Sequence, residues 1–421
     1  MKQIAIIGFG SRGQMFAQLL SDMKDVHLVA VAEPVEYSRV LANERFGVPA
    51  SMCFQDAEAF FRQGKICDAL FVCTQDSTHC EIAVRALELG YDICLEKPAA
   101  VTLEQCLLIR DTAKRLGRKV MLTHVLRYAP FYRSIRQWIE DGSLSEIVHI
   151  DQTENVSYWH FALSYVRGPW RSAANSTPSI IAKCCHDLDI ICWLMHKKCV
   201  RVSSFGQLNF FNQKHAPTGS ALYCADCDET TKRNCLFNAY SIYPERVKNP
   251  VVGGVARLKG MNIYDVLDGR NDIVGRCVFH AGNDVADNQS VQMEFTDGTT
   301  AHLTMTAFSA DCHRYIHVHG TRGEVSGDLE SGILYRQIYG ERPCSIDIND
   351  NTADRHLDLR SHGGGDYYLC RDFIEYITND VPSATRTTID EAIESHIIGF
   401  MAEESRKRNG QVMELKGYNA W

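Results

Sequence analysis

The sequence predicts an α/β protein of two domains: a first domain on a parallel sheet, then a mixed α+β domain whose strands are antiparallel. Over residues 1–125, apolar runs alternate with helical stretches of about 10–15 residues, which is typical of βαβ units. Beyond residue 125, long segments alternate apolar and polar residues, as half-buried strands do. We therefore expect one domain at residues 1–125 and a second at 126–421, within the two or three domains that 421 residues allow.

The elements of the first domain follow from the hydrophobic pattern. Short apolar runs that end in glycine or a polar residue predict buried parallel strands, and apolar residues at helical spacing predict helices. Strands are expected at residues 3–8, 27–33, 68–73, 91–95 and 119–124. Helices are expected around residues 15–20 and at 38–46, 79–89 and 102–116, with Gly90 ending the third.

The second domain begins with one more helix and continues with strands. The helix is expected at residues 130–141, and the strands at 146–156, 290–296, 299–308, 314–319 and 333–338. Asp297-Gly298 predicts a hairpin between two of these strands. Residues 209–287 are rich in Gly, Asn, Asp and Cys and lack clear periodicity, so we expect an inserted, loop-rich segment. Helices return at residues 366–379 and 388–408.

Composition excludes several classes of protein. The chain is 45% hydrophobic and 23% charged, unlike a disordered, collagen-like or coiled-coil chain. Its formal net charge is −8 and its longest basic run is Arg406-Lys407-Arg408, so we expect no nucleic-acid partner. No apolar run approaches the roughly 20 residues that span a bilayer, and the start of the chain does not resemble a signal peptide. We therefore expect a cytoplasmic protein with no membrane partner.

The first strand ends in a glycine-rich turn, Gly8-Phe9-Gly10-Ser11-Arg12-Gly13, which opens the first helix. This is the context in which G-x-G-x-x-G binds a dinucleotide: the glycines permit a tight turn, close approach of a pyrophosphate and close helix packing. Glu33 ends the second strand and can accept hydrogen bonds from a ribose 2′-hydroxyl. We therefore expect NAD in preference to NADP, although Arg12 and Arg39 leave an opening for the 2′-phosphate.

A second polar group follows the strand at residues 68–73. Thr74, Asp76 and His79 lie where that strand meets a helix, and loops at the carboxyl ends of parallel strands face the ligand. The alternative is a capped helix start, with Ser77 or Thr78 as the N-cap. Both readings can hold together.

Glu96-Lys97-Pro98 ends the strand at residues 91–95, and Pro98 prevents that strand from continuing. Lys97, held beside a nicotinamide, could orient a substrate hydroxyl and take its proton. A lysine acts as a base near pH 7 only when burial or a neighbouring cation favours its neutral form. The alternative is a solvated lysine paired with Glu96.

A third group of polar residues precedes the apolar stretch IICWLM. In Lys183-Cys184-Cys185-His186-Asp187-Leu188-Asp189, helical spacing places Lys183, His186 and Ile190 on one face. A histidine suits proton transfer to or from an alcohol oxygen. The alternative is a partly buried histidine that hydrogen-bonds for structure, and the adjacent lysine and two aspartates favour a polar site.

Together these residues resemble the Gfo/Idh/MocA oxidoreductases, the family of glucose–fructose oxidoreductase and inositol dehydrogenase. The resemblance spans nearly the whole chain. It also rests on three further motifs: Pro169-Trp170-Arg171, His319-Gly320-Thr321-Arg322-Gly323 and His362-Gly363-Gly364-Gly365-Asp366. It implies a Rossmann domain, a second α+β domain with a large, mostly antiparallel open sheet, NAD or NADP, a sugar or polyol substrate, and Lys97 and His186 as the catalytic pair.

One departure from the family concerns the residue four positions before His186. Inositol dehydrogenase-like members often carry an acid there, whereas this chain has Ala182, with Lys183 beside it. An Asp–His relay therefore cannot be carried over. Lys183 could take part of its role, because a second cation near Lys97 would favour the neutral lysine.

The expected site comprises residues of three kinds: cofactor-binding, catalytic and substrate-binding. The cofactor-binding residues are Gly8, Phe9, Gly10, Ser11, Arg12, Gly13, Glu33, Thr74, Asp76, His79, Glu96 and Lys97. The catalytic residues are Lys97, His186 and Lys183. The substrate-binding residues are Arg127, Tyr128, Trp170, Arg171 and Asp187, because sugars pack on aromatic faces and bind forked donors.

Three functions compete. The first is an NAD-dependent dehydrogenase of a sugar, cyclitol or glycoside hydroxyl. The second is a redox-neutral glycoside hydrolase or lyase that oxidises a hydroxyl transiently. The third, a non-enzymatic NAD-binding regulator, conflicts with the presence of both Lys97 and His186.

A homodimer or homotetramer is expected, because a large open sheet with one face to cover often pairs with another subunit. In strand 299–308 one face carries Ala301, Leu303, Met305 and Ala307. The other carries Thr300, His302, Thr304 and Thr306, a mixed surface that suits an interface.

The chain has 17 cysteines, which in a reducing compartment mostly serve as small buried apolar residues. Cys224, Cys227 and Cys235 form a separate group within the inserted segment. Thiolates at this spacing suit zinc, but a fourth ligand is missing, and spacing does not choose between His215 and Cys277. We therefore assign no metal site from the sequence and leave open free thiols, a disulfide or a structural metal.

Overall fold

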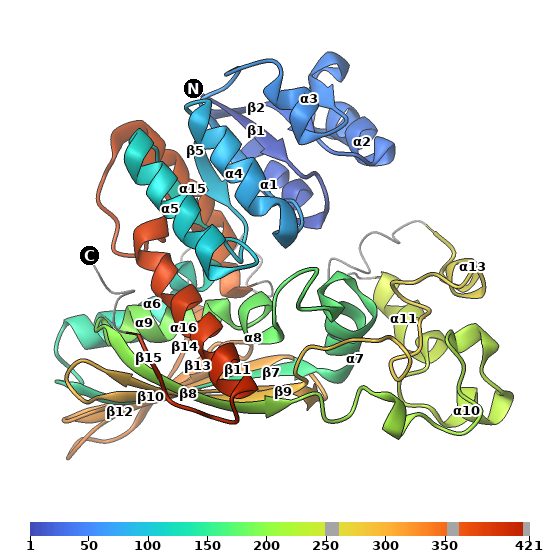
Figure 1. Ribbon diagram of the computed structural model, residues 1–421. Helices are drawn as coiled ribbons and strands as arrows, with labels where there is room; N and C mark the ends of the chain where they lie inside the picture. The colour runs from blue at the N-terminus through green and yellow to red at the C-terminus, as the bar shows by residue number, and fades with distance from the viewer. Residues whose placement is uncertain (249–260, 352–361, 416–421) are drawn as a thin grey trace. The chain divides into compact units, whose positions relative to one another are not determined.

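The computed structural model describes residues 1–248, 261–351 and 362–415 (Figure 1). The chain divides into two compact units. The first comprises residues 1–134 and 349–397, and the second comprises residues 135–348 and 398–421. Each unit is described by itself.

The first unit is built on a six-stranded parallel sheet, sheet A, with the order β3-β2-β1-β4-β5-β6. Its strands are β1 (Lys2–Ile7), β2 (Val26–Ala32), β3 (Cys53–Phe54), β4 (Ala69–Val72), β5 (Asp92–Leu95) and β6 (Val120–Leu122). Their residues are almost all buried, as expected for a parallel sheet covered on both faces. The strand order reverses between β1 and β4, and ligands of such sheets bind at this switch point. The predicted parallel domain is confirmed.

Helices cover sheet A. They are α1 (Ser11–Ser21), α2 (Glu36–Phe46), α3 (Ala57–Phe61), α4 (His79–Glu88) and α5 (Leu103–Leu116). The next helix in the chain, α6 (Pro130–Glu140), spans the boundary between the two units. Helix α5 begins at the N-cap Thr102, whose side chain accepts the N–H of Gln105, and ends at Gly117 in the left-handed conformation.

The C-terminal part of the chain also contributes to the first unit. Helix α15 (Gly365–Asn379) places Leu369, Cys370 and Phe373 in the same apolar core as α1 and β1. The Phe373 ring packs edge-to-face on Phe71 of β4, with 5.2 Å between ring centroids. The sequence pattern predicts this segment in the second domain, whereas its contacts group residues 349–397 with the first unit.

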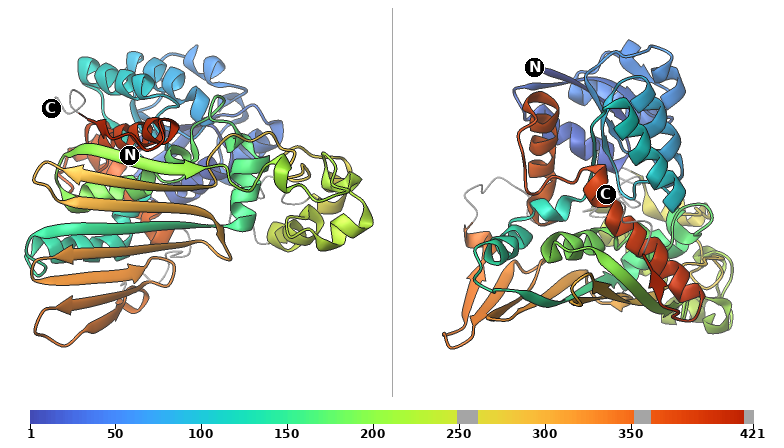
Figure 2. Two further views of the ribbon diagram at one scale, coloured as in Figure 1. Left: turned by 60° about the horizontal axis from the view of Figure 1, so that its bottom comes forward. Right: turned by 60° about the vertical axis from the view of Figure 1, so that its left-hand side comes forward.

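The second unit is built on a nine-stranded sheet, sheet B, with the order β14-β13-β12-β11-β7-β10-β9-β8-β15 (Figure 2, left). Its strands are β7 (Ile147–Ser157), β8 (Cys199–Gln207), β9 (Asn288–Phe295), β10 (Thr300–Ser309), β11 (His313–Gly320), β12 (Gly323–Asp328), β13 (Ile333–Ile338), β14 (Cys344–Asp347) and β15 (Met413–Glu414). Among the strand pairs that the structure describes in sheet B, only β7–β10 is parallel. The expected mostly antiparallel sheet is confirmed, including the hairpin at Asp297-Gly298, where φ of Gly298 is +84°.

Short helices accompany sheet B. They are α7 (Tyr158–Phe161), a π-helical turn (Ala162–Arg167), α8 (Ser179–Ala182), α9 (Cys185–Met195) and, in the inserted segment, α10 (Glu229–Asn234), α11 (Ala239–Lys248) and α13 (Ile263–Asp268). Helix α9 packs against β7 and β10 on the buried face of the sheet. On β10 that face consists of Ala301, Leu303, Met305 and Ala307, all fully buried, as the alternation predicts.

The final long helix, α16 (Ile389–Lys407), carries acidic residues in its first turn and basic residues in its last, which suits the helix dipole. Among the described helices, none combines the length and the apolar composition that crossing a bilayer requires.

Candidate active site

The glycine turn between β1 and α1 can be built only with glycine at two positions. Gly8 has φ of +90°, and a Cβ there would lie 2.6 Å from the carbonyl carbon of Cys73. A Cβ at Gly13 would lie 2.2 Å from the carbonyl oxygen of Gly8. Both distances are too short for a Cβ atom. At Gly8 the backbone of the turn therefore lies directly against the residue that follows β4, at the switch point of sheet A.

Helix α1 begins without a capping side chain. Its N-cap is Gly10, which makes no side-chain capping hydrogen bond, and its first turn contains no acidic residue. The N-terminus of a helix carries partial positive charge and unsatisfied donors, so it binds anions. This arrangement fits the pyrophosphate of a dinucleotide.

Glu33 follows β2 and is held against the glycine turn. Its Oε2 accepts the Phe9 N–H at 2.7 Å and its Oε1 accepts the Val35 N–H at 3.0 Å. A carboxylate has about four acceptor positions, so lone pairs remain for the hydroxyls of a ribose. Arg39 donates to the backbone carbonyls of Glu33 and Pro34, at 2.6 and 2.8 Å.

The residues after β4 form a one-turn helix (Asp76–Thr78) that leads into α4. Thr78 occupies the N-cap position of α4, but its hydroxyl bonds the Thr74 hydroxyl and the Gln75 carbonyl instead of capping the helix. The His79 ring is fully buried, with its nitrogens 2.8 Å from Pro98 O and 3.2 Å from Thr74 O. We therefore assign His79 the role of joining two loops, rather than the direct cofactor contact expected from the sequence.

Arg12 lies between two buried carboxylates. Its Nε is 2.5 Å from Glu96 Oε1, and a terminal nitrogen is 2.9 Å from Asp366 Oδ1. Burial raises the pKa of both carboxyls, but the Arg12 guanidinium outweighs burial and holds each pKa below its usual value. His362 adds a contact of 3.0 Å to Asp366. The guanidinium therefore bonds protein carboxylates, and sequence reasoning found Asp366 only as part of the family resemblance.

Lys97 follows Glu96 at the end of β5 and is partly exposed. Its backbone N–H lies 3.0 Å from Glu96 Oε2 and 3.2 Å from Thr123 Oγ1, so the start of the Lys97 side chain is fixed in space. Among the described ion pairs, the Glu96 carboxylate is bound by Arg12. The Lys97 charge also acts to lower the pKa of Glu96, so a paired, solvated Lys97 stays an alternative beside the catalytic role.

Arg127 and Tyr128 were expected at the substrate, and the structure buries them in the first unit. Arg127 is 3% exposed and donates to Glu391 at 3.0 Å. Tyr128 is 2% exposed and its hydroxyl donates to Asp372 at 2.7 Å. We therefore assign both residues a structural role in holding the C-terminal helices, because neither leaves surface for a sugar.

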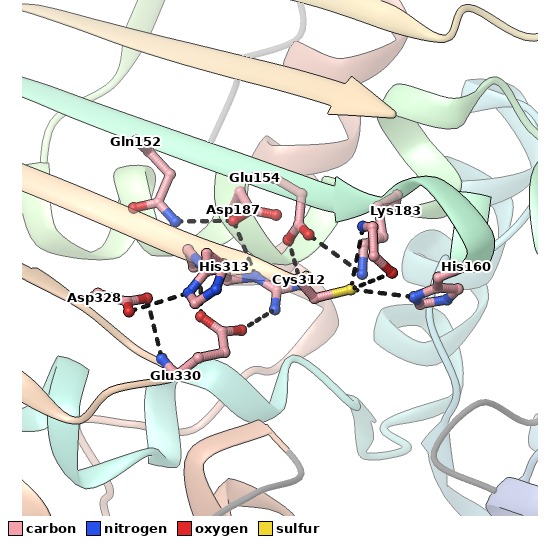
Figure 3. Close-up of polar contacts among 11 residues, drawn as sticks. Gln152, Glu154, His160, Lys183, Asp187, Cys312, His313, Asp328 and Glu330 are labelled. Atoms are coloured by element: carbon pink, nitrogen blue, oxygen red, sulfur yellow. Dashed lines mark hydrogen bonds and ion pairs between the residues drawn. The ribbon is translucent and has the colours of Figure 1, made fainter. Parts of the chain in front are cut away.

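The second unit contains a cluster of buried charges where α9 covers β7 and β11 (Figure 3). Arg314 and Glu154 are directly opposite on neighbouring strands, with 2.5 Å between nitrogen and oxygen. Arg314 also lies 3.3 Å from Asp187 and 3.4 Å from Glu330. Lys183 lies 3.4 Å from Glu154. Glu154 and Asp187 have no exposed surface.

This cluster holds a proton that titrates near neutrality. Burial, with the nearby Glu154 carboxylate, raises the pKa of Asp187 to about 7, although Arg314 and the Gln152 amide, 2.9 Å away, partly oppose the shift. Burial also raises the pKa of Glu330. Two cations face three carboxyls, so one carboxyl can stay protonated at neutral pH. Groups that titrate near the working pH are common in active sites.

His186 lies in the first turn of α9 and is 3% exposed. Asp187 and Asp189, its neighbours on the helix, are also buried. Lys183 precedes the helix, so it is positioned by the loop and by Glu154 rather than by the helical register expected from the sequence. Trp170 and Arg171 stay partly exposed in a one-turn helix (Pro169–Arg171), as a substrate contact requires.

Sequence reasoning missed Gln152, Glu154 and Arg314, although a signal exists. On β7 the face that carries the buried Ile150 and Val156 also carries Gln152 and Glu154. On β11 the face of Ile316 and Val318 carries Arg314. Charged residues on the apolar face of an alternating strand indicate a buried polar site, because such burial requires partners.

The chain matches two family models. Residues 2–124 match the NAD-binding Rossmann fold of the Gfo/Idh/MocA oxidoreductase family, and residues 136–415 match the C-terminal alpha/beta domain of the same family.

Curated relatives include YteT of Bacillus subtilis (strain 168), 23% identical over 398 residues, which cover 88% of each chain. An alpha-N-acetylgalactosaminidase of Bacteroides fragilis is 28% identical over 156 residues, 36% of this chain and 37% of that protein. The scyllo-inositol 2-dehydrogenase (NAD(+)) of Bacillus subtilis (strain 168) is 23% identical over 257 residues, 59% of this chain and 70% of that protein.

Solved structures share the whole fold. The scyllo-inositol dehydrogenase of Lactobacillus casei, solved with NAD(H) and scyllo-inositol, superposes with a TM-score of 0.67 at 18% identity, over 98% of this chain and 99% of that one. An oxidoreductase of Agrobacterium radiobacter, solved with NAD+, L-tartaric acid and magnesium, gives a TM-score of 0.70 at 13% identity over 98% of each chain.

Proposed function

The chain belongs to the Gfo/Idh/MocA oxidoreductase family, and on that premise we propose that it is an NAD-dependent dehydrogenase of a secondary hydroxyl in a sugar, cyclitol or glycoside. The observation that carries the proposal is the turn at Gly8 and Gly13, which leaves no room for side chains beside an uncapped helix. The relative named as a scyllo-inositol 2-dehydrogenase supports the substrate class.

The preference for NAD rests on Glu33. Two backbone N–H groups hold its carboxylate at the end of β2, where it would accept a ribose hydroxyl and repel a 2′-phosphate. Arg39, which could have bound that phosphate, donates to two backbone carbonyls.

Oxidation of the hydroxyl requires two transfers, a hydride from carbon and a proton from oxygen. NAD, when bound, accepts the hydride that leaves the hydroxyl-bearing carbon. In this proposal Lys97 orients the hydroxyl and takes its proton, and His186 is the second group able to hold it. Each turnover removes one hydride from carbon and one proton from oxygen. Lys183, Glu154, Asp187 and Arg314 fix the start of α9 and so position His186.

A redox-neutral glycoside hydrolase is the second candidate, because of the similarity to an alpha-N-acetylgalactosaminidase. There the hydride and the hydroxyl proton would leave the sugar as before, giving a ketone. Loss of the proton on the carbon next to that ketone would then expel the aglycone, water would add to the resulting double bond, and the hydride and a proton would return to the ketone. The residues required are the same, so the two functions differ in net NADH formation.

The test is a panel of sugars, cyclitols and aryl glycosides with NAD or NADP, followed by absorbance of the reduced nicotinamide. Net NADH with an alcohol supports the dehydrogenase, and aryl-glycoside cleavage on catalytic NAD without net NADH supports the hydrolase. The variant Lys97→Ala should lose at least about 100-fold in kcat while NAD still binds, because proton transfer contributes on this order.

The matched control is Lys114→Ala, which removes an exposed lysine of α5 in the same unit and should leave kcat unchanged. Turnover retained in Lys97→Ala would remove that residue from the mechanism. Failure of every substrate with both nucleotides, with NAD binding intact, would refute the enzymatic proposal.

A further inference from the structure

Four cysteines of the inserted segment line one pocket, together with Arg167. Cys224 lies in a one-turn helix (Cys224–Asp226), Cys227 follows it, Cys235 follows α10, and Cys277 comes more than forty positions later in the chain. His215, the other possible fourth ligand, does not line this pocket. Its Nδ1 is 3.2 Å from Asn212 Oδ1 and its ring packs on Phe210.

The backbone brings the distant cysteine beside the first one. The Cys224 N–H donates to Gly275 O at 2.9 Å, and the Cys277 N–H donates to Leu222 O at 2.8 Å. These two bonds flank an antiparallel bridge between Tyr223 and Arg276. Cys224 therefore faces Gly275 and Cys277 faces Leu222, so the two cysteines are diagonal neighbours on the same side of this bridge.

Backbone N–H groups are aimed at the sulfur atoms. The Ala221 N–H donates to Cys227 Sγ at 3.3 Å. The backbones at Phe237 and Phe279, each two residues after a cysteine, act to lower the pKa of Cys235 and Cys277, against the larger effect of burial. Such bonds stabilise a thiolate, and hydrogen bonds to ligand atoms are a regular feature of metal sites. Without a metal, burial dominates and raises the pKa of Cys277 to about 11, so the cation itself must displace the protons.

Arg167 provides an independent observation. Its side chain is fully buried, and it donates to Arg276 O at 2.5 Å, Phe237 O at 2.6 Å, the Tyr243 hydroxyl at 2.7 Å and Cys224 Sγ at 3.8 Å. Within the described part of the chain, none of these acceptors is a carboxylate. A buried cation needs a compensating charge, and four thiolates around a divalent ion carry a net charge of −2.

We propose that Cys224, Cys227, Cys235 and Cys277 bind a structural zinc ion, with Arg167 as the counter-charge beside the cluster. Four sulfur ligands around one ion are typical of closed structural zinc sites. All four thiols are free rather than paired as disulfides. The proposal does not depend on the proposed enzymatic function.

A zinc ion at this position would stabilise the inserted segment. The inserted segment consists of short helices, α10, α11 and α13, beside α7 (Figure 1). Their apolar cluster is small, with eight buried members: Leu163, Cys224, Ala239, Ile242, Tyr243, Ile263, Leu267 and Val274. Segments with so little core usually require a disulfide or a metal. A zinc ion would join the chain near residue 224 to the chain near residue 277.

The test measures zinc in the full-length chain, purified without chelator and with any affinity tag removed. Mass spectrometry of the metals should find about one zinc per chain. Cys277→Ser and Cys224→Ser should each reduce zinc by at least about fivefold, since a structural site loses affinity without its fourth ligand. Cys344→Ser, a partly exposed cysteine of β14, should keep the full content.

A second control addresses competing ligands. His317, His319 and Glu324 on sheet B could also hold a metal. His319→Gln should leave the zinc content unchanged, and loss of zinc in His319→Gln but not in Cys277→Ser would overturn the proposal.

Cobalt keeps the proposal testable if the serine variants fail to fold. The wild-type chain produced with Co²⁺ should show the intense visible bands and sulfur-to-cobalt charge transfer of a tetrahedral thiolate site. Absence of both zinc and cobalt bands would refute the site. So would iron with acid-labile sulfide, or an intact mass that reveals a disulfide among the four cysteines.

Discussion

The carboxyl group of Asp187 has no exposed surface, and it lies beside Arg314 and near a second buried carboxyl, Glu154. Burial raises its pKa to about 7, far above the ordinary value near 4. Because the folded-state pKa lies above the unfolded one, ionising Asp187 costs the folded state free energy. That cost is absent below about pH 4, grows between pH 4 and pH 7, and levels off above pH 7, where Asp187 is ionised in both states.

We therefore expect Asp187→Asn to change how stability depends on pH. The wild type should lose stability through this group between pH 5 and pH 8, and the variant should not. Relative to wild type, the variant should gain roughly 1–3 kcal/mol over that interval. Urea unfolding at both pH values measures it, with Asp311→Asn, an exposed residue of the same unit, as the control. Equal pH slopes in wild type and Asp187→Asn would contradict the assignment.

Arg12 belongs to the glycine-rich motif in sequence, but its side chain contacts protein carboxylates. It stands within the glycine-rich sequence, yet its guanidinium joins Glu96 and Asp366. The backbone of the motif can bind a pyrophosphate. The Arg12 side chain instead fixes the Glu96 carboxylate, which accepts the backbone N–H of Lys97.

At the scale of an element, the start of α1 depends on Gly13. A Cβ there would lie 2.2 Å from Gly8 O, so Gly13→Ala must push the helix away from β1. We expect at least about a tenfold increase in the Kd for NAD, since 1.4 kcal/mol of lost contact has that effect. Calorimetric titration measures it. Gln18→Ala, on the same helix but away from the turn, should bind NAD normally, and normal binding by Gly13→Ala would show that the turn does not hold the nucleotide.

Helix α15 belongs with the nucleotide-binding strands although about 240 residues separate it from β6. Phe373 is fully buried against Phe71 of β4. We expect Phe373→Ala to destabilise the first unit by about 3–5 kcal/mol, the usual cost of truncating a buried phenylalanine. Hydrogen exchange should accelerate in β1 and β4.

The strands of sheet B serve as the internal comparison for that experiment. Their exchange should change less than that of β1 and β4 in Phe373→Ala. Faster exchange confined to sheet B would place α15 in the other unit.

At the scale of the whole molecule, one face of sheet B is polar and partly exposed. It includes Thr304 and Thr306 of β10 and four histidines on neighbouring strands: His149, His302, His317 and His319. Burial, aided by the adjacent His317, lowers the pKa of His319. Histidines and threonines on one face of a sheet suit contact with a second copy of the chain, so we keep the homodimer or homotetramer as a prediction.

A charge placed on this face tests the prediction. We expect size-exclusion chromatography with light scattering to find a dimer or tetramer for the wild type. Thr304→Arg should shift it toward the monomer, because a desolvated cation opposes association. Gln63→Arg adds the same charge at an exposed site of the first unit and should leave the assembly unchanged. A monomeric wild type, or no shift in Thr304→Arg, would refute this interface.

The sequence by itself determined the fold class, nearly all the long elements and the glycine turn. These features follow from short-range patterns: apolar runs, the alternation of apolar and polar residues, and glycines at positions that only glycine can occupy. Periodicity reports which face of an element is buried. It does not report what packs against that face.

The tertiary structure alone decided several features that depend on distant partners. Residues 349–397 group with the first unit by their contacts. Arg127 and Tyr128 are buried and bond residues near the C-terminus, and Glu154 pairs with Arg314 on the neighbouring strand. The structure also places Cys277 beside Cys224. Each depends on contacts between segments far apart in the chain, where the free energy comes from burial and charge pairing that no local pattern encodes.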